Sequence, residues 1–390
     1  MEVDNTYKYK DKRPHPGKAQ DLIRLIHLEP SQELESGIEC KLHHTTLSSH
    51  KYEYIAVSYV WGDASDKRSI TVNGKRLDIT ASLECALRHI RDSSDILLIW
   101  ADGICINQND VQDRNEQVPL MGDIYYNART TTIFLGLSSW QIDHAMRFMA
   151  SYGESENGLI TAAAYEEFWQ GTLVGNVAVV EQEILARPWF TRVWILQEFI
   201  LSRDPWLQCG RSRIRWQRFF ESVTLDGSAR WAKDSRTIVK SMNDSRQRFR
   251  ETNASDNWAT VIPEVVPDSY LLELLCARRG CQLSDPRDMV YAHLGLASAR
   301  IRKAIPIDYS KTVAHLFEDV SRFYMMTITS TSVQTMLSFV EQSPNEQRGA
   351  AHPSWVPDWS SEYQPGSSDR PTVPKDLQFF ESTPAVPNSS

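Results

Sequence analysis

The sequence predicts an α/β protein, in which a mostly parallel sheet flanked by helices is followed by a mainly helical C-terminal region. Residues 96–100 (ILLIW) form an unbroken apolar run, which is typical of a strand buried on both faces. A polar loop follows from Asp102, then a stretch with helical apolar spacing, and then a second apolar run over residues 131–135 that ends at Gly136. This order indicates a βαβ unit, whose ligands usually bind at the carboxyl end of the strand.

Two further strands are predicted before this unit. Residues 1–20 are polar and rich in lysine, which indicates a flexible leader. Residues 22–28 favour a short strand, and residues 52–60 (YEYIAVSYV) are rich in β-branched and aromatic side chains, as strands are. The tripeptide WGD at positions 61–63 ends the second of these strands. We expect the strands near residues 55, 98 and 133 to lie side by side in one sheet, with their downstream ends around a common hollow.

A hairpin and a helix are predicted between residues 69 and 90. Asn73 and Gly74 lie between two strand-like runs and favour a type I′ turn. Thr80 can cap the helix that follows. That helix has one apolar face, made of Leu83, Ala86, Leu87 and Ile90.

More helices are predicted after Gly136. Residues 140–150 and 165–186 have helical patterns, and residues 191–201 favour either a helix or a buried strand. Residues 206–209 are expected to form one more short strand.

The C-terminal half has a different character. Residues 211–250 contain eleven Lys or Arg and only four Asp or Glu, with aromatics between them. This pattern is compatible with a nucleic-acid surface, but solvated helical faces are the simpler interpretation. Asp285 and Pro286 suit the first positions of a helix, and residues 313–327 predict another. Residues 361–390 contain five Pro, six Ser and no periodicity, which indicates disorder.

The chain is therefore expected to have four parts. A flexible leader covers residues 1–20, and an α/β domain covers residues 21–210. A mainly α-helical accessory region follows over residues 211–360, and residues 361–390 form a disordered tail.

The composition is that of an ordinary globular protein. The 390 residues suffice for two or three domains, and the net charge of −8 argues against general nucleic-acid binding. None of the six cysteines forms a CxxC pair, and no apolar run resembles a signal peptide or a membrane span, so we expect a cytoplasmic protein with free thiols. The adjacent His43 and His44 point to opposite faces of a strand, and no metal site is predicted.

Four blocks of the sequence occur in a recognisable order and spacing. They are YEYIAVSYVWGD, the stretch from ITVNG to LRHIR, IWADGICINQND with the following segment through IFLG, and RPWFTRVWILQEF. Together they resemble the heterokaryon-incompatibility (HET) domain of filamentous fungi over about residues 50–205. LSDPRDMVYAHLGLA, IPIDYSK and HPSWVPDWS are similar to segments that commonly follow that domain. One departure is ADG at positions 101–103, where the family more often has Asp-Ala after Ile or Val.

The resemblance implies a role in fungal non-self recognition, a form of innate immunity in which such domains are effectors of growth arrest or programmed cell death. The HET domain is also similar to TIR domains, which implies a TIR-like (flavodoxin-like) sheet. Some TIR domains cleave NAD with a glutamate. If this chain is an enzyme, the resemblance implies an NAD(P) glycohydrolase that takes NAD as substrate and needs no cofactor. The alternative is a non-catalytic module that self-associates or acts as an adaptor for a protein partner in the same pathway.

Two carboxylates are candidates for such catalysis, because the transition state resembles an oxocarbenium ion. Glu198 lies in an otherwise apolar run, where a charge is costly unless it faces a pocket or a partner. In a helix it would lie one turn from Trp194, and Arg192 would point elsewhere. A surface glutamate, or one bonded to a neighbouring loop, is the alternative. Asp102 follows a buried strand, where α/β sites gather, and a loop-capping role is its alternative.

Four further residues are candidates for holding the dinucleotide. Trp61 would stack on an adenine or nicotinamide ring, and Gly62 and Asp63 would line the same crevice. A packed aromatic over a tight turn is the alternative for Trp61. Asn107 lies in the loop after the strand at residues 96–100, where turn formation is its simpler role.

Overall fold

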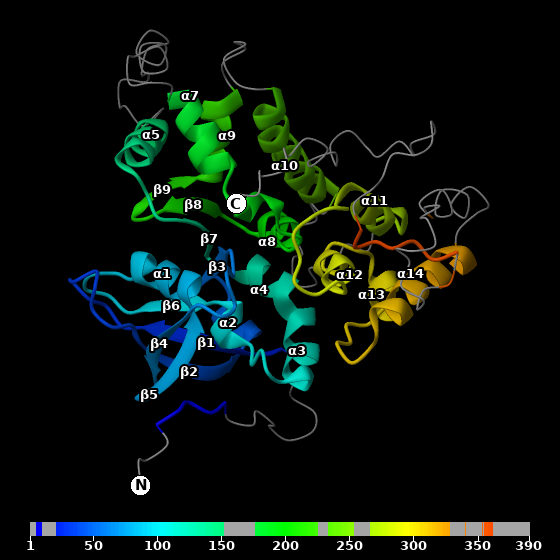
Figure 1. The fold of residues 1–390 in the computed structure, drawn as a ribbon, viewed down its shortest axis with the longest axis horizontal. Helices are drawn as coiled ribbons and strands as arrows, with labels where there is room; N and C mark the ends of the chain where they lie inside the picture. The colour runs from blue at the N-terminus through cyan, green and yellow to red at the C-terminus, as the bar shows by residue number, and fades with distance from the viewer. Residues whose placement is uncertain are drawn as a thin grey trace. The chain divides into compact units, whose positions relative to one another are not determined.

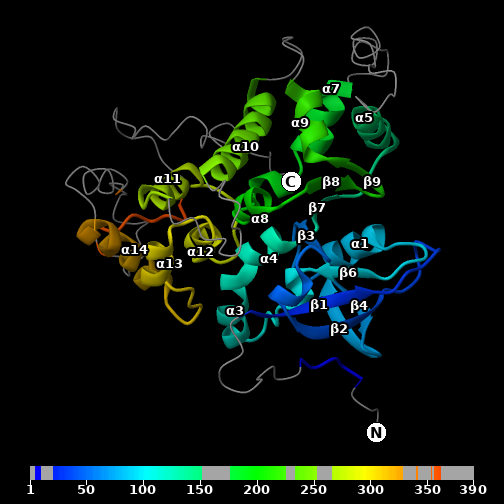
Figure 2. The same ribbon diagram turned by 180° about the vertical axis from the view of Figure 1, so that it is seen from behind.

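The chain divides into two compact units. The computed structural model describes residues 5–9, 21–151, 176–224, 233–252, 266–327, 340, 353 and 355–361. The first unit comprises Met1–Phe190 and Leu201–Ala232, and the second comprises Thr191–Ile200 and Lys233–Ser390. The first contains the β-sheet, whereas the described part of the second is helical (Figures 1 and 2).

One nine-stranded sheet forms the centre of the first unit. Its strands lie in the order β5-β4-β2-β1-β6-β3-β7-β8-β9. In chain order they are β1 (Leu22–Leu28), β2 (Glu39–Thr46), β3 (Ile55–Tyr59), β4 (Lys67–Val72), β5 (Lys75–Thr80), β6 (Leu97–Trp100), β7 (Thr130–Gly136), β8 (Pro205–Cys209) and β9 (Ser212–Arg215).

The four strands β6, β3, β7 and β8 are parallel neighbours. Ile55 on β3 pairs with Ile99 on β6 and with Thr130 on β7, and β8 pairs with β7. The strands predicted near residues 55, 98 and 133 therefore do lie side by side in one sheet. Numbered by their own order in the chain, these four strands lie in the order 2-1-3-4. All five residues of β3 are buried, as expected for a strand covered on both faces.

The complete sheet is mixed, with the predicted parallel strands next to antiparallel ones. Of the eight pairings between described strands, four are antiparallel: β1 with β2, β1 with β6, β4 with β5, and β8 with β9. Short turns explain two of these pairings, because a two-residue connection can join only antiparallel strands. Asn73 and Gly74 have φ of 51° and 75°, which confirms the predicted type I′ turn, and Gly210 (φ 52°) lies in the turn between β8 and β9.

Helices cover both faces of this sheet. The Gln208 side chain on β8 donates a hydrogen bond to the carbonyl of His89 on α1, at 3.1 Å. Ser212 on β9 donates to Asp143 on α5, at 2.6 Å. Gln208 is the cross-strand partner of Arg213, the neighbour of Ser212, so Gln208 and Ser212 point to opposite faces. Helices α1 and α5 therefore lie on opposite faces of the sheet.

The helical segments of the first unit are short, and Figure 1 shows α5, α7 and α9 together beside β8 and β9. They are the 3₁₀ turn Leu47–His50, α1 (Ala81–Ile90), α2 (Asp102–Cys105), α3 (Val111–Gln117), the 3₁₀ turn Val118–Leu120, α4 (Met121–Asn127), α5 (Trp140–Ser151), α7 (Asn176–Val179), a π-helical turn (Val180–Leu185) and α9 (Trp216–Thr224). The 3₁₀ turn Pro188–Thr191 lies where the chain passes to the second unit. The Thr80 hydroxyl accepts from the Leu83 N–H at 3.4 Å, which confirms it as the cap of α1.

The N-terminal segment is partly held to this unit. Thr6 forms a β-bridge with Arg76, and the Tyr9 hydroxyl donates to the Ile104 carbonyl at 2.9 Å. Residues 5–9 of the predicted flexible leader are thus attached through backbone and side-chain hydrogen bonds. The rest of that leader, and the predicted tail after residue 361, lie outside the described residues. Pairing of β8 and β9 with the sheet, and packing of α9 on these strands, extend the first unit past the predicted boundary at residue 210.

The described part of the second unit consists of helices and loops. The helices are α8 (Ile195–Leu201, whose last residue is assigned to the first unit), α10 (Lys233–Thr252), α11 (Ser269–Ala277), α12 (Asp288–Leu294), α13 (Ala299–Ala304) and α14 (Val313–Thr327). Every residue of α8 is buried, so the segment predicted as a helix or a buried strand is a helix without an exposed face. The sequence predicted that this helix would begin beside Asp285, but α12 begins at Asp288. The Asp285 side chain accepts from the Arg287 N–H at 3.0 Å.

No helix in the described parts of the chain is long and apolar enough to cross a membrane. All six cysteines lie within the described residues, and each is a free thiol.

Candidate functional site

A tryptophan and a carboxylate meet at the carboxyl ends of two adjacent parallel strands. Trp61 follows β3, and Asp102 follows β6. The indole N–H of Trp61 donates to Asp102 Oδ2 at 2.8 Å. The sequence predicted both residues as site candidates, and the structure brings them into direct contact.

The carboxylate of Asp102 is largely committed to this contact. Its side chain is 8% exposed, and its Oδ1 accepts from the Gly103 N–H at 2.7 Å. Gln108 holds the same loop through a hydrogen bond to the Asp102 carbonyl at 2.9 Å. With both oxygens engaged, Asp102 fixes the indole of Trp61 rather than presenting a free oxygen to a ligand.

The small residue after Asp102 is required by its surroundings. A Cβ at Gly103 would lie 2.6 Å from the Tyr59 hydroxyl and 2.9 Å from Leu83 Cδ2. Both neighbours are buried, so neither can move aside freely. The glycine that departs from the family pattern is thus matched to Tyr59.

The other predicted binding residues have local roles. Gly62 has φ of 69° and allows the turn after Trp61, whose carbonyl accepts from the Ser82 hydroxyl at 2.7 Å. Asp63 Oδ1 accepts from both the hydroxyl and the backbone N–H of Ser65, and these bonds lower the pKa of Asp63. Asn107 donates its backbone N–H to Asp113, at 2.7 Å.

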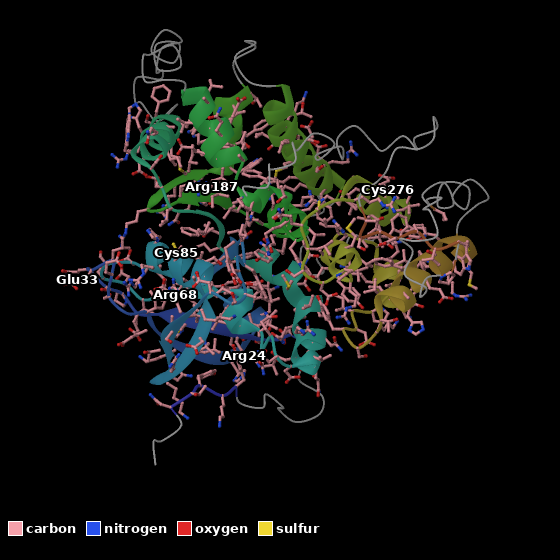
Figure 3. All side chains as sticks on the ribbon, in the orientation of Figure 1. Arg24, Glu33, Arg68, Cys85, Arg187 and Cys276 are labelled. Carbon is pink, nitrogen blue, oxygen red and sulfur yellow. The ribbon has the colours of Figure 1, made fainter. Side chains whose placement is uncertain are left out.

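A buried ion pair holds the segment that follows β6. Arg24 on β1, marked in Figure 3, makes a two-pronged contact with Asp113 on α3 at 2.8 and 3.0 Å. The side chains are only 3% and 7% exposed. Arg24 also donates to the carbonyl of Cys105 at 2.7 Å. These residues were missed from the sequence, because 89 positions separate the two charges.

Glu198 lies in the second unit, on α8. Its side chain is 2% exposed, so the alternative of a surface glutamate is wrong. The Arg192 guanidinium lies 3.9 Å from Glu198 Oε2, which corrects the prediction that Arg192 points elsewhere. The Glu198 N–H donates to the Trp194 carbonyl at 3.2 Å, which confirms the one-turn spacing between these residues. The burial of Glu198 beside a cation is typical of a structural ion pair.

Trp194 and Asp288 extend the same buried network. The indole of Trp194 donates to Asp288 Oδ2 at 3.1 Å, and the Tyr309 hydroxyl donates to Oδ1 at 2.7 Å. The Gly295 N–H donates to the side chain of Gln197 at 3.1 Å, where a Cβ would lie 2.4 Å from the same oxygen. These bonds join segments from the QEF, DPRD and DYS blocks of the sequence.

The basic stretch 211–250 is divided between the units. In the first unit, Arg213 and Arg215 lie over the ring of Trp206, at 5.0 and 4.9 Å. In the second, Arg246 is buried and donates to the Phe199 carbonyl at 2.7 Å. Structural contacts thus account for part of the positive charge. Among the described residues, no group of three His, Cys, Asp or Glu side chains is placed to hold a metal ion.

The first unit is thus an α/β sheet protein with a Trp–Asp contact at the ends of its central strands. Residues 54–198, which include both of these residues, match the family model described as Heterokaryon incompatibility protein (HET). The match begins at β3 and ends at Glu198, so it covers the parallel strands β3, β6 and β7.

A curated protein is similar to a longer part of the chain. The chain is 26% identical over 392 residues to the Neurospora crassa protein named "Heterokaryon incompatibility protein 6, OR allele". The alignment covers 87% of this chain and 58% of the relative, so the chain spans little more than half the length of that protein. Both findings are similarities to heterokaryon incompatibility proteins. No solved structure matches the chain.

Proposed function

We propose that this chain is a cytoplasmic effector of fungal non-self recognition that promotes growth arrest or cell death after incompatible cells fuse. The HET match over residues 54–198 and the similarity to a heterokaryon incompatibility protein support this role. The six free thiols favour a reducing compartment.

We further infer that the first unit is TIR-like and cleaves NAD at the bond between nicotinamide and ribose. The observation that supports this is the 2-1-3-4 order of the parallel strands β6, β3, β7 and β8. In open sheets of this order, ligands bind where the connections of neighbouring strands leave on opposite faces. Here β3 leads through the β4–β5 hairpin to α1 on one face and β7 leads to α5 on the other, which favours a site at the carboxyl ends of β3 and β7.

Trp61 lies at this point and provides a flat surface for an aromatic ring. Its indole is fixed by Asp102, which orients the ring without needing to contact the substrate. Asp102 is then a positioning residue. Glu198 is buried beside Arg192, and that burial favours a structural role for it.

The test is nicotinamide release from NAD and NADP by the purified chain, measured by chromatography. We expect Trp61→Ala to lower the rate at least tenfold, and Asp102→Asn to lower it through a higher KM, because the indole loses its fixed orientation. Trp206→Phe, on β8 and away from the β3 loop, is the matched control. Absence of release by the wild-type chain would remove the enzymatic part of the proposal.

A second candidate is a non-catalytic module that self-associates. Leu137 and Trp140 support it, because they are 59% and 61% exposed and lie three positions apart after β7. Exposed aromatic and aliphatic side chains are frequent anchors of protein interfaces. Sedimentation velocity distinguishes this candidate: Trp140→Ala would dissociate an oligomer that the wild-type chain forms.

A further inference from the structure

A second polar cluster lies at the carboxyl ends of β7 and β8 in the first unit. It combines the loop after Gly136, the start of α5 and the π-helical turn Val180–Leu185. Arg187, marked in Figure 3, follows that turn. None of the residues in this cluster was a site candidate from the sequence.

Arg187 is held by two hydrogen bonds, and no carboxylate of the described residues pairs with its charge. Its Nε donates to the Glu183 carbonyl at 2.6 Å, and one terminal nitrogen donates to the Leu137 carbonyl at 3.1 Å. The other terminal nitrogen lies 3.1 Å from where a Cβ on Gly136 would be, so glycine leaves it room. Among the described residues, no carboxylate lies within 4 Å of this guanidinium.

Among the described residues, the carboxylate of Glu183 has a hydrogen-bond donor at one of its two oxygens. Its Oε2 accepts from the Ser139 hydroxyl at 2.9 Å, and that hydroxyl in turn accepts from the Ile142 N–H at 3.2 Å, capping α5. Its other oxygen has no hydrogen-bond donor within the described parts of the chain. The Ala186 N–H donates to the Glu181 carbonyl, five residues back, and π-helical turns of this kind are frequent at functional sites.

Cys209, at the end of β8, is buried near this cluster. Burial raises the pKa of its thiol to about 12, the Arg187 charge opposes that rise, and the charges of Asp143 and Glu183 add to it. Trp140 is the residue after Ser139, at the start of α5, and it is 61% exposed.

We propose that Trp140, Glu183 and Arg187 bind a nucleotide, with Ser139 holding one oxygen of Glu183. The open oxygen of Glu183 accepts hydrogen bonds from the ribose hydroxyls, and the guanidinium of Arg187 pairs with a phosphate. Trp140 stacks on the base. The cluster lies at the carboxyl end of β7, one of the two strands whose carboxyl ends border the site proposed for NAD cleavage. The proposal rests on the proposed NAD cleavage only in its choice of nucleotide, because binding does not require turnover.

The experiment titrates the full chain with ADP-ribose, AMP and adenosine by calorimetry, and each ligand tests one contact. We expect Arg187→Ala to weaken AMP binding at least tenfold and to leave adenosine binding unchanged. Glu183→Gln should weaken all three ligands, and 2′,3′-dideoxyadenosine should bind the wild-type chain as poorly as adenosine binds this variant. Trp140→Ala should weaken all ligands that carry the base.

Matched controls are Arg129→Ala, directly before the amino end of β7, and Glu116→Gln, on the exposed side of α3. Both should bind as the wild-type chain does. Wild-type protein that binds none of the ligands, or variants that bind as these controls do, would overturn the proposal. Loss of binding only in the cluster variants, with no nicotinamide release by the wild-type chain, would uphold the binding site while removing the proposed cleavage. A Trp140→Ala variant that changes sedimentation but not nucleotide affinity would assign that side chain to a protein interface and overturn its stacking role.

Discussion

Two polar groups near the carboxyl ends of the parallel strands differ in how completely the protein satisfies them. At β6, Asp102 has both carboxylate oxygens engaged and is 8% exposed. After β7, among the residues that the structure describes, Glu183 has one engaged oxygen and Arg187 donates to neutral carbonyls. The first group is closed, meaning that its hydrogen bonds are satisfied within the protein. The second is open, because it can still form hydrogen bonds with another molecule.

The difference shows why a carboxylate in an apolar run is an uncertain sign of catalysis. Burial of a charge is costly, so buried acids are found with donors already in place. A group that binds a ligand must keep some of its hydrogen-bonding capacity unused and accessible. Substitutions at the closed groups should therefore change the free energy of unfolding more than a substitution at the open group of Glu183 and Arg187.

The largest effect is expected at the most closed pair, Arg24 with Asp113. Asp113→Ala should lower the free energy of unfolding of the first unit by about 3–5 kcal/mol, because it leaves a buried guanidinium without its partner. Urea unfolding measures this. Glu29→Ala breaks the exposed contact with Lys41 and should lower the free energy of unfolding far less, because solvent screens this pair. Equal losses in the two variants would contradict the distinction between closed and exposed pairs.

Next comes a pH effect in the second unit. Burial, followed by the nearby Arg278 charge, lowers the pKa of His293 to about 3. The unfolded chain binds a proton at His293 below about pH 6.5 and the folded chain does not, so stability falls as the pH decreases from 6.5 towards 3.

The expected slope is at most about 1.4 kcal/mol per pH unit, or about 2 kcal/mol between pH 6.5 and 5. Urea unfolding at pH 7, 6 and 5 measures it. His293→Gln should flatten the dependence whatever its own stability, whereas His315→Gln, which changes an exposed histidine, should keep it. The same slope in His293→Gln as in the wild-type chain would refute the assignment.

Trp61→Phe should have an intermediate effect. The variant keeps an aromatic ring but removes the N–H that donates to Asp102, leaving a buried carboxylate oxygen with one fewer donor. The expected cost is about 1–3 kcal/mol in the free energy of unfolding. Combining it with Asp102→Asn in a double-mutant cycle should give a coupling energy clearly above zero. Additive losses would show that the two residues act independently.

The smallest effect on stability is expected at the open group. Glu183→Gln keeps the shape of the side chain and an oxygen for the Ser139 hydroxyl, so the free energy of unfolding should change by less than about 0.5 kcal/mol. Thermal or urea unfolding measures this. A loss as large as that of Trp61→Phe would show that Glu183 is also a closed, structural group.

The sequence determined the features that depend on neighbouring residues. The apolar runs fixed β3, β6 and β7, Asn-Gly fixed the hairpin turn, and Thr80 fixed the start of α1. These features follow from backbone preferences and periodicity over a few positions. The order of the blocks also predicted the HET similarity, which residues 54–198 confirm.

Only the tertiary structure decided how the sheet is completed and which charges meet. The antiparallel outer strands arise from pairings that the local pattern of each strand does not specify. Trp61 and Asp102 are 41 positions apart, and Ser139 and Glu183 are 44 apart. Arg192 and Glu198 are close in sequence, yet their approach depends on how the chain enters α8. Side-chain partners of this kind are set by the packing of whole elements, because a hydrogen bond depends on distances that sequence spacing alone does not define.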